Sequence, residues 1–130
     1  MIYGIGVDIV EIARIKRAYE RWGRRFAEKI LGPTELEHFA VTRTPVRFLA
    51  MRFAAKEAVS KAFGTGFKQG VSPRQIEVRH NTAGKPALTF LGSVSEIAEH
   101  ENIAASYLSM ADEREYAIAY VVLEQLVVPS

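Results

Sequence analysis

Two acidic residues have the surroundings that a metal-binding or catalytic carboxylate needs. Asp8 lies where an alternating strand pattern gives way to a helical one. Glu57 lies within a long helical pattern, with Ala50 and Ala54 on its own face and Lys61 one turn later. The small neighbours leave room for a ligand. If the two carboxylates converge, they can hold a hard Mg²⁺ that keeps positions free for water and substrate phosphates.

Each of these acids also has a purely structural interpretation. Asp8, with Glu11 three residues later, has the spacing of a capping box and can serve as a helix N-cap worth about 1 kcal/mol. Glu57 and Lys61 have the i,i+4 spacing of an exposed helical ion pair worth roughly 0.3–0.5 kcal/mol. Spacing alone favours these structural interpretations, because the functional one requires the two side chains to meet in the fold.

Basic residues concentrate on two predicted helices. Between residues 12 and 30, seven basic residues face two acidic ones, and four arginines lie along one side of the helix: Arg14, Arg17, Arg21 and Arg24. Such a stripe suits an acidic protein helix, a phosphate backbone or an anionic membrane surface, or it is simply solvated. On the long helix, Arg52, Lys56 and Lys61 can neutralise phosphates beside a metal or form a solvated face.

Other kinds of site are excluded or unsupported. The chain has no cysteine, so it has neither thiolate chemistry nor disulfides, and His38, His80 and His100 form no ligand spacing. Gly4-Ile5-Gly6 lacks the third glycine of a nucleotide-binding loop. No apolar run approaches the ~20 residues of a membrane span, and the first ten residues lack a basic leader. The absence of cysteine suits the cytosol.

The long helix that carries Glu57 is expected from Thr44 to Gly66. Thr44 is the predicted cap, Pro45 suits the first turn, and Gly64 is the predicted stop. Its predicted apolar arc consists of Phe48, Met51, Ala55, Ala58, Val59 and Ala62.

The remaining patterns predict strands near both ends and helices between them. Strands are expected over residues 2–9, 75–80, 87–91, 105–111 and 116–124. Helices are expected from Glu11 to about Leu31 with a break near Gly23, from Thr34 to Ala40 with Glu37 completing its start, and for about two turns from Ser93 with Glu96. On the first strand, Gly4 and Gly6 permit another backbone to approach closely. A length of 130 residues is expected to form one domain.

Two long motifs resemble the bacterial holo-[acyl-carrier-protein] synthases, the short trimeric type of 4′-phosphopantetheinyl transferase. They are GIGVDIVEIARI near the start and RFAAKEAVSKAFGTG in the long helix. The likeness extends to Gly84-Lys85-Pro86 and to the run LSMADEREYAIAYVVLE. The resemblance implies an α+β fold over residues 1–130, with a mainly antiparallel sheet packed against a long central helix.

The resemblance also implies an activity. Members transfer 4′-phosphopantetheine from coenzyme A to a serine hydroxyl of apo-acyl carrier protein and release adenosine 3′,5′-bisphosphate, in a cytoplasmic, Mg²⁺-dependent step of fatty acid biosynthesis. Asp8 and Glu57 match the Mg²⁺ ligands, and Arg52 and Lys61 match basic positions around the phosphates of the coenzyme. A metal-associated water or a nearby carboxylate is the expected base for the serine proton.

The same resemblance implies a partner for the arginine stripe. Members of the family bind an acidic acyl carrier protein through a basic first helix. Arg14, Arg17, Arg21 and Arg24 are therefore the expected docking residues. The family also implies a homotrimer with active sites between subunits, and neither nucleic acid nor membrane as a partner. A non-catalytic module that binds nucleic acid or acidic proteins through the stripe is the alternative.

One position departs from the family pattern. Many members have Ser-x-Ser/Thr-His before the last strand, where this chain has Ser109-Met110-Ala111-Asp112. Asp112 replaces a histidine that can donate to phosphate or shuttle a proton. The carboxylate can instead hold a water, bind a basic neighbour or act as a base.

Overall fold

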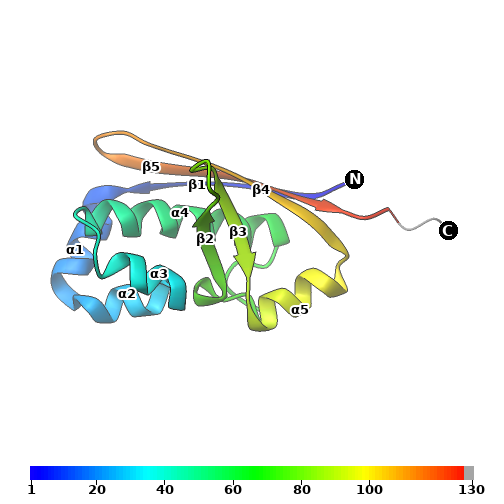
Figure 1. Cartoon of the computed structure of the whole chain (residues 1–130), viewed down its shortest axis with the longest axis horizontal. Helices are drawn as coiled ribbons and strands as arrows, with labels where there is room; N and C mark the ends of the chain where they lie inside the picture. Colours follow the sequence, from blue (N-terminus) through cyan, green and yellow to red (C-terminus); the bar gives the residue numbers. More distant parts are fainter. Residues whose placement is uncertain (128–130) are drawn as a thin grey trace.

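A long helix, α4, lies beneath a three-stranded sheet, and shorter helices cover its other side (Figure 1). The computed structural model describes residues 1–127. Its elements in chain order are β1 (Ile2–Glu11), α1 (Ile12–Trp22), α2 (Arg24–Ile30), α3 (Pro33–Phe39), α4 (Pro45–Phe63), the short 3₁₀ turn η1 (Pro73–Gln75), β2 (Ile76–His80), β3 (Pro86–Phe90), α5 (Gly92–His100), β4 (Ile103–Asp112) and β5 (Tyr116–Gln125).

All strand pairings are antiparallel, as the family resemblance implies. The larger sheet has the order β1-β5-β4, so the first and last strands of the chain pair along their whole lengths. The β2–β3 hairpin forms a second sheet that contacts β4 through β3. The five predicted strands are all present, with ends that differ by one or two residues, and Gly23 breaks the first helical region where expected. The α+β expectation is therefore confirmed.

The contact between β1 and α4 depends on two glycines. A Cβ on Gly4 would lie 2.0 Å from the carbonyl oxygen of Ala62, and one on Gly6 would lie 1.9 Å from that of Ala58. Only glycine allows the strand to approach the helix backbone this closely. The predicted close approach is confirmed, and it sets the short distance between α4 and the strand that carries Asp8.

The interpretation of the basic residues of α4 as a solvated face is wrong for Arg52 and Lys56 but holds for Lys61, which is half exposed. Arg52 and Lys56, which that interpretation places in solvent, are buried. The sheet covers one side of α4, and α2, α3 and β2 pack around its other sides, so that no broad side is left to solvent. Gly64 ends the helix in the left-handed conformation, at φ 80°, as predicted.

Two predicted helix caps are also wrong, and a third lacks its predicted hydrogen bond. Asp8 lies inside β1, because the strand continues in its ladder with β5 as far as Glu11. Thr44 is the N-cap residue of α4, as predicted, but its side chain makes no cap hydrogen bond. Ser93 does not cap α5; its hydroxyl instead lies 2.6 Å from the Gly70 carbonyl and from the Gln75 side chain, since tertiary partners are available.

The start of α3 was predicted at the wrong residue. Gly32 is the N-cap, and its N–H donates to the Glu35 carboxylate. The predicted start, with Thr34 as the cap and Glu37 as its partner, is therefore wrong. Pro33, with its fixed φ, occupies the first helical position and so sets the start one residue earlier.

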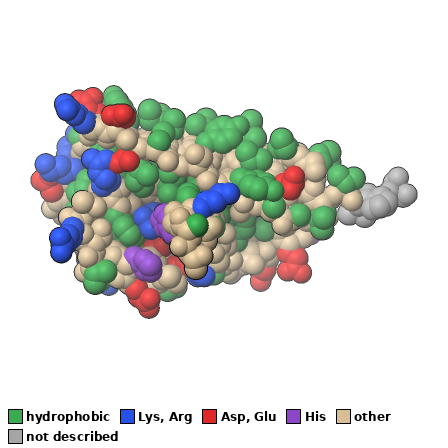
Figure 2. Space-filling view, turned by 45° about the horizontal axis from the view of Figure 1, so that its top comes forward, with side chains coloured by type: hydrophobic (Ala, Val, Ile, Leu, Met, Phe, Trp, Pro, Cys, Tyr) green, Lys and Arg blue, Asp and Glu red, His purple; other side chains and the backbone are tan. Residues whose placement is uncertain are grey.

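The outer face of the larger sheet is apolar and open. The alternation of β1 directs its glycines toward α4 and its branched residues outward. The exposed apolar side chains of this face are Ile5, Val7, Ile9, Ile118 and Tyr120. Figure 2 shows hydrophobic side chains spread along this upper side of the molecule. None of the helices in residues 1–127 combines the length and apolar character needed to cross a bilayer.

Candidate active site

The fold brings Asp8 and Lys61 into direct contact. Asp8 follows Gly4 and Gly6 on the side of β1 that faces α4. The Lys61 ammonium donates to Asp8 Oδ1 at 3.0 Å and to the Val7 carbonyl at 3.1 Å. The Asp8 side chain is 16% exposed and that of Lys61 is 52% exposed, so the pair lies at the rim of the sheet–helix interface.

Glu57 joins this group from the preceding turn of α4. Burial raises the pKa of Glu57, and the charge of Asp8 raises it further, while Lys61 and Arg14 lower it. Two carboxylates and two cations therefore share one site. Asp8 and Glu57 thus lie close enough for each to feel the other's charge, which is the convergence that the functional interpretation requires. Lys61 pairs with Asp8 across the interface rather than forming the local helical pair with Glu57.

This donor set fits a hard cation. Within residues 1–127 no group of three or more His, Cys, Asp or Glu side chains gathers around a common point. Mg²⁺ is commonly bound by one or two carboxylates together with substrate phosphates and water. Burial and then the charge of Asp8 raise the pKa of Glu57, and a bound cation would relieve the repulsion between the two carboxylates. The site therefore suits a metal shared with a phosphate-bearing substrate.

Arg52 lies elsewhere. It is nine residues before Lys61 on α4, which is about two and a half turns, so the two side chains leave the helix on opposite sides. In one protomer the structure does not bring Arg52 to the group formed by Asp8, Glu57 and Lys61. Its Nε lies 3.5 Å from Glu35 Oε2, and its guanidinium stacks 3.6 Å from the centre of the Phe48 ring.

Lys56 is fully buried in a polar network that the sequence did not reveal. Its three ammonium protons are used by Glu35 Oε1 at 2.6 Å, by the Pro73 carbonyl at 2.8 Å and by the Ile76 carbonyl. Burial lowers the pKa of Lys56, and the Glu35 charge opposes that effect. Lys56 is thus a structural cation and not a free phosphate ligand. Glu35 precedes it by twenty-one positions, and no local spacing indicates the pair.

Asp112 forms an ion pair with Arg47, from the first turn of α4. Of the three expected roles, this contact supports the binding of a basic neighbour. Asp112 pairs with Ala117 on β5, which in turn pairs with Val10 on β1. A whole strand therefore separates Asp112 from the strand that carries Asp8 within one protomer.

The predicted arginine stripe is exposed but divided between two helices. Arg14, Arg17 and Arg21 lie on α1, whereas Arg24 lies on α2 beyond the break at Gly23. Figure 2 shows basic side chains gathered at the left end of the molecule, where Figure 1 draws α1 and α2. Local partners restrain some of them, since Arg17 lies 3.8 Å from Glu11 and Arg24 donates to Glu28.

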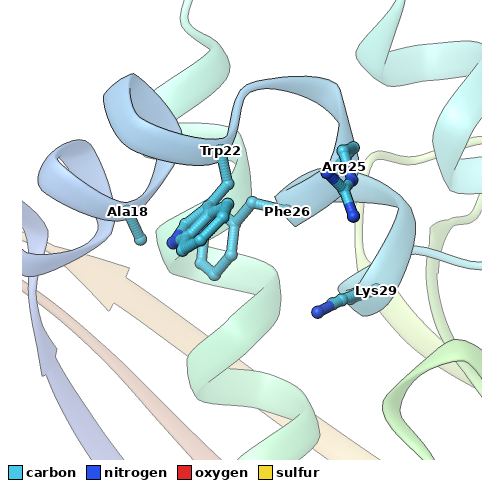
Figure 3. A pocket seen from close by; sticks show the side chains of 5 residues that line it. All are labelled: Ala18, Trp22, Arg25, Phe26 and Lys29. Carbon is cyan, nitrogen blue, oxygen red and sulfur yellow. The ribbon is translucent and has the colours of Figure 1, made fainter.

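A hollow between α1 and α2 adds an apolar component to this surface (Figure 3). The Trp22 and Phe26 rings lie side by side, and Arg25 and Lys29 extend from α2 at its edge. The Arg21 guanidinium stacks 4.9 Å from the Trp22 ring. An aromatic hollow edged by cations suits an apolar side chain on an acidic helix.

Both the sequence and the fold of this chain are similar to those of known proteins. Residues 4–121 match the model of the 4′-phosphopantetheinyl transferase superfamily. A holo-[acyl-carrier-protein] synthase of Halorhodospira halophila is 53% identical over 95% of this chain and 98% of its own length. The crystal structure of the synthase from Neisseria meningitidis superposes with a TM-score of 0.92 at 46% identity, covering 96% of this chain and all (100%) of that one.

A further structure, the Helicobacter pylori synthase in complex with coenzyme A, superposes with a TM-score of 0.81 at 32% identity, covering 92% of this chain and 99% of that one. These matches span nearly the whole chain. The protein belongs to the 4′-phosphopantetheinyl transferase superfamily and, within it, to the holo-[acyl-carrier-protein] synthases.

Proposed function

We propose that this protein transfers 4′-phosphopantetheine from coenzyme A to a serine hydroxyl of apo-acyl carrier protein, in a Mg²⁺-dependent reaction that releases adenosine 3′,5′-bisphosphate. The observation that carries the proposal is the convergence of Asp8 and Glu57, with Lys61 and Arg14 beside them, in a member of this family. Cytoplasmic fatty acid biosynthesis is the proposed setting, and it rests on family membership alone.

Asp8 and Glu57 would hold the Mg²⁺, which neutralises charge on the diphosphate of the coenzyme when it is bound. Lys61 holds Asp8 in position and, being half exposed, can also donate to the leaving phosphate. Arg14 adds a second positive charge to the same site. These cations favour the negative charge that develops as the bond between the two phosphates breaks.

A base must accept the serine proton, and Asp112 is poorly suited to that role in this chain. Its carboxylate is engaged in an ion pair with the Arg47 guanidinium. A metal-associated water or a nearby carboxylate is therefore the proposed acceptor of the serine proton.

A homotrimer is part of the proposal. The open apolar face around Ile5, Val7 and Tyr120 is the kind of surface that a second copy covers. Arg52 and Asp112 also lie away from the Asp8 group within one protomer. In the proposed trimer, Arg52 and Asp112 would approach a coenzyme held by Asp8 and Glu57 from a neighbouring subunit.

The test is a transfer assay read by mass. The protein is incubated with coenzyme A, Mg²⁺ and an apo-acyl carrier protein, and the carrier is weighed. The carrier is expected to gain one phosphopantetheine, and Glu57→Ala is expected to abolish the gain while circular dichroism stays unchanged. A carrier without added mass under every metal condition would exclude the transferase. Salt-sensitive binding of nucleic acid by a protein inert toward coenzyme A would favour the alternative binding module.

The carrier is expected to dock on the basic surface of α1 and α2. Reversing two charges, Arg17→Glu with Arg21→Glu, should raise KM for the carrier about tenfold at low salt and leave KM for coenzyme A unchanged, because surface charge pairs steer encounter. The exposed Arg74→Glu on η1 serves as a control. An unchanged KM for the carrier in the double variant would contradict docking at this surface.

A further inference from the structure

The turn that joins β4 to β5 lies against the start of α1 (Figure 1). The Glu113 N–H donates to the Tyr116 carbonyl and closes the turn. The N–H of Ile12, the first residue of α1, donates to the Glu115 carbonyl at 2.8 Å. Glu11, the N-cap residue, makes no side-chain cap hydrogen bond. The turn therefore satisfies one of the N–H groups that the start of a helix leaves without a partner.

Few contacts hold the turn and the helix in this arrangement. A hollow of about 780 Å³ lies beside the hydrogen bond, and residues of the turn and of the first turn of α1 line it. The two segments therefore do not pack closely there. The position of the start of α1 depends on what holds the turn.

An ion pair ties the same turn to α4. Asp112 is the last residue of β4, and its carboxylate pairs with the guanidinium of Arg47, from the first turn of α4. The Arg47 side chain is 46% exposed and that of Asp112 is 28% exposed. An ion pair this accessible to water contributes little to stability. Its effect is instead to fix the place of the turn relative to the helix that carries Glu57.

The tilt of α1 matters because this helix links the Asp8 group to the basic surface. Arg14, two residues after Ile12, lies close enough to lower the pKa of Glu57. Arg21 is nine residues after Ile12, which is about 14 Å along the helix axis. A small tilt at the start of α1 therefore moves Arg21 much more than Arg14. A carrier docked on a tilted helix would present its serine away from the site, and such misplacement is costly for a transfer reaction.

We propose that Arg47 and Asp112 are positioning residues for the carrier, because their ion pair holds the β4–β5 turn and the turn fixes the tilt of α1. The inference rests on the proposed function and on docking at α1. It adds a part in carrier binding for two residues that lie outside the basic surface. It also gives Asp112 a role that it performs through Arg47 and the turn.

The experiment is a double-mutant cycle with Arg47→Gln, Asp112→Asn and the variant that combines them. KM for the apo-carrier is measured at saturating coenzyme A. Equilibrium binding of a carrier without tryptophan is followed by the fluorescence of Trp22, which is the one tryptophan of the chain and lies on α1. The matched controls are Arg43→Gln, one turn before Arg47, and Glu113→Gln, next to Asp112. Both control residues are exposed, and each control makes the same change of charge as its test variant.

Each single variant should raise KM and the dissociation constant for the carrier about three- to fivefold. The combined variant should raise them no further, because both changes break the same contact. Arg47→Gln should keep kcat within about twofold and leave KM for coenzyme A unchanged, since uniform loss of carrier binding appears in KM alone. Melting temperatures should stay close to that of the wild type. Both controls should behave as the wild type.

Effects that multiply in the combined variant would show that the two residues act separately, and would overturn the inference. Unchanged carrier binding in both single variants would also overturn it. So would a loss of about a hundredfold in kcat for Asp112→Asn without a matching effect of Arg47→Gln, because that result is typical of direct proton transfer. In all three cases the wild type still modifies the carrier. A wild type that adds no mass to the carrier would instead exclude the proposed function.

Discussion

At the scale of single residues, Glu57 shows how a site can oppose stability. Its carboxylate is partly buried and lies near the charge of Asp8, and both effects favour the protonated form. Because the folded-state pKa is raised above the unfolded value, folding is favoured when the group is protonated. That stability is present below the unfolded pKa and is lost as the pH rises through the folded pKa.

Glu57→Gln should therefore raise the melting temperature of the metal-free protein at neutral pH, and the difference from the wild type should shrink as the solution is made more acidic than the unfolded pKa of about 4.5. Scanning calorimetry over a pH series measures this. Mg²⁺ with coenzyme A should stabilise the wild type more than the variant, through preferential binding to the folded state. A variant less stable than the wild type at neutral pH would contradict the expectation.

Lys56 differs from Glu57, because its ammonium group, although burial disfavours its charge, satisfies a buried carboxylate and two carbonyl groups. Lys56→Met should destabilise the protein by about 3–5 kcal/mol, because it leaves Glu35 buried beside unsatisfied carbonyl groups. Urea denaturation monitored by circular dichroism measures the loss. The control is Lys68→Met, which removes an exposed lysine and should change stability by well under about 1 kcal/mol.

At the scale of elements, the packing of α4 against β1 determines which helix residues meet Asp8. Gly4 and Gly6 allow the backbones to touch at Ala62 and Ala58 on one side of α4, and Lys56 ties the other side to α3 and β2. Held between these contacts, α4 cannot rotate freely. Glu57 and Lys61 therefore face Asp8.

Gly6→Ala should test this packing. The added methyl group would overlap the carbonyl oxygen of Ala58, so the strand and helix must separate. We expect a loss of about 1–3 kcal/mol in unfolding free energy and a larger fractional loss of transfer activity, because Asp8 and Glu57 move apart. Ala104→Val, at an exposed position of β4, is the control. Full activity in Gly6→Ala would show that the close approach does not position the site.

At the scale of the whole molecule, the apolar outer face of the larger sheet is the feature that a lone protomer does not explain. Scattered exposed apolar residues are ordinary, but here they follow β1 and β5 in register, with Val7 opposite Tyr120 and Ile9 opposite Ile118. The proposed trimer would cover this face with other copies of the chain. The proposed sites between subunits depend on this face.

Val7→Glu should dissociate the proposed trimer and abolish transfer while leaving the protomer folded, because a charge buried between apolar sheet faces is strongly unfavourable. Light scattering coupled to size exclusion measures the mass. Val41→Glu changes an equally apolar residue that is 80% exposed in the α3–α4 loop, away from the sheet, and should change neither mass nor activity. A wild type that is monomeric and fully active would contradict the proposed assembly.

The sequence by itself determined the elements and the candidate residues. Alternation and helical spacing predicted all five strands and the long helix, since these patterns follow from local backbone geometry, and Gly64 marked the helix end correctly. Two long motifs indicated the family, which the comparisons confirm, and they carried Asp8 and Glu57 with them. The glycines of β1 also predicted a close backbone contact correctly.

Only the tertiary structure decided how the polar residues of α4 are used. Spacing cannot distinguish a solvated helix face from one covered by α3 and β2, and the partner of Lys56 lies in a different element. The same limit applied to Asp8. Its spacing suggested a helix cap, but in the fold Asp8 lies in a strand that pairs with the last strand of the chain. Contacts between distant segments fix these outcomes, because each polar group takes the partner that the folded chain brings to it.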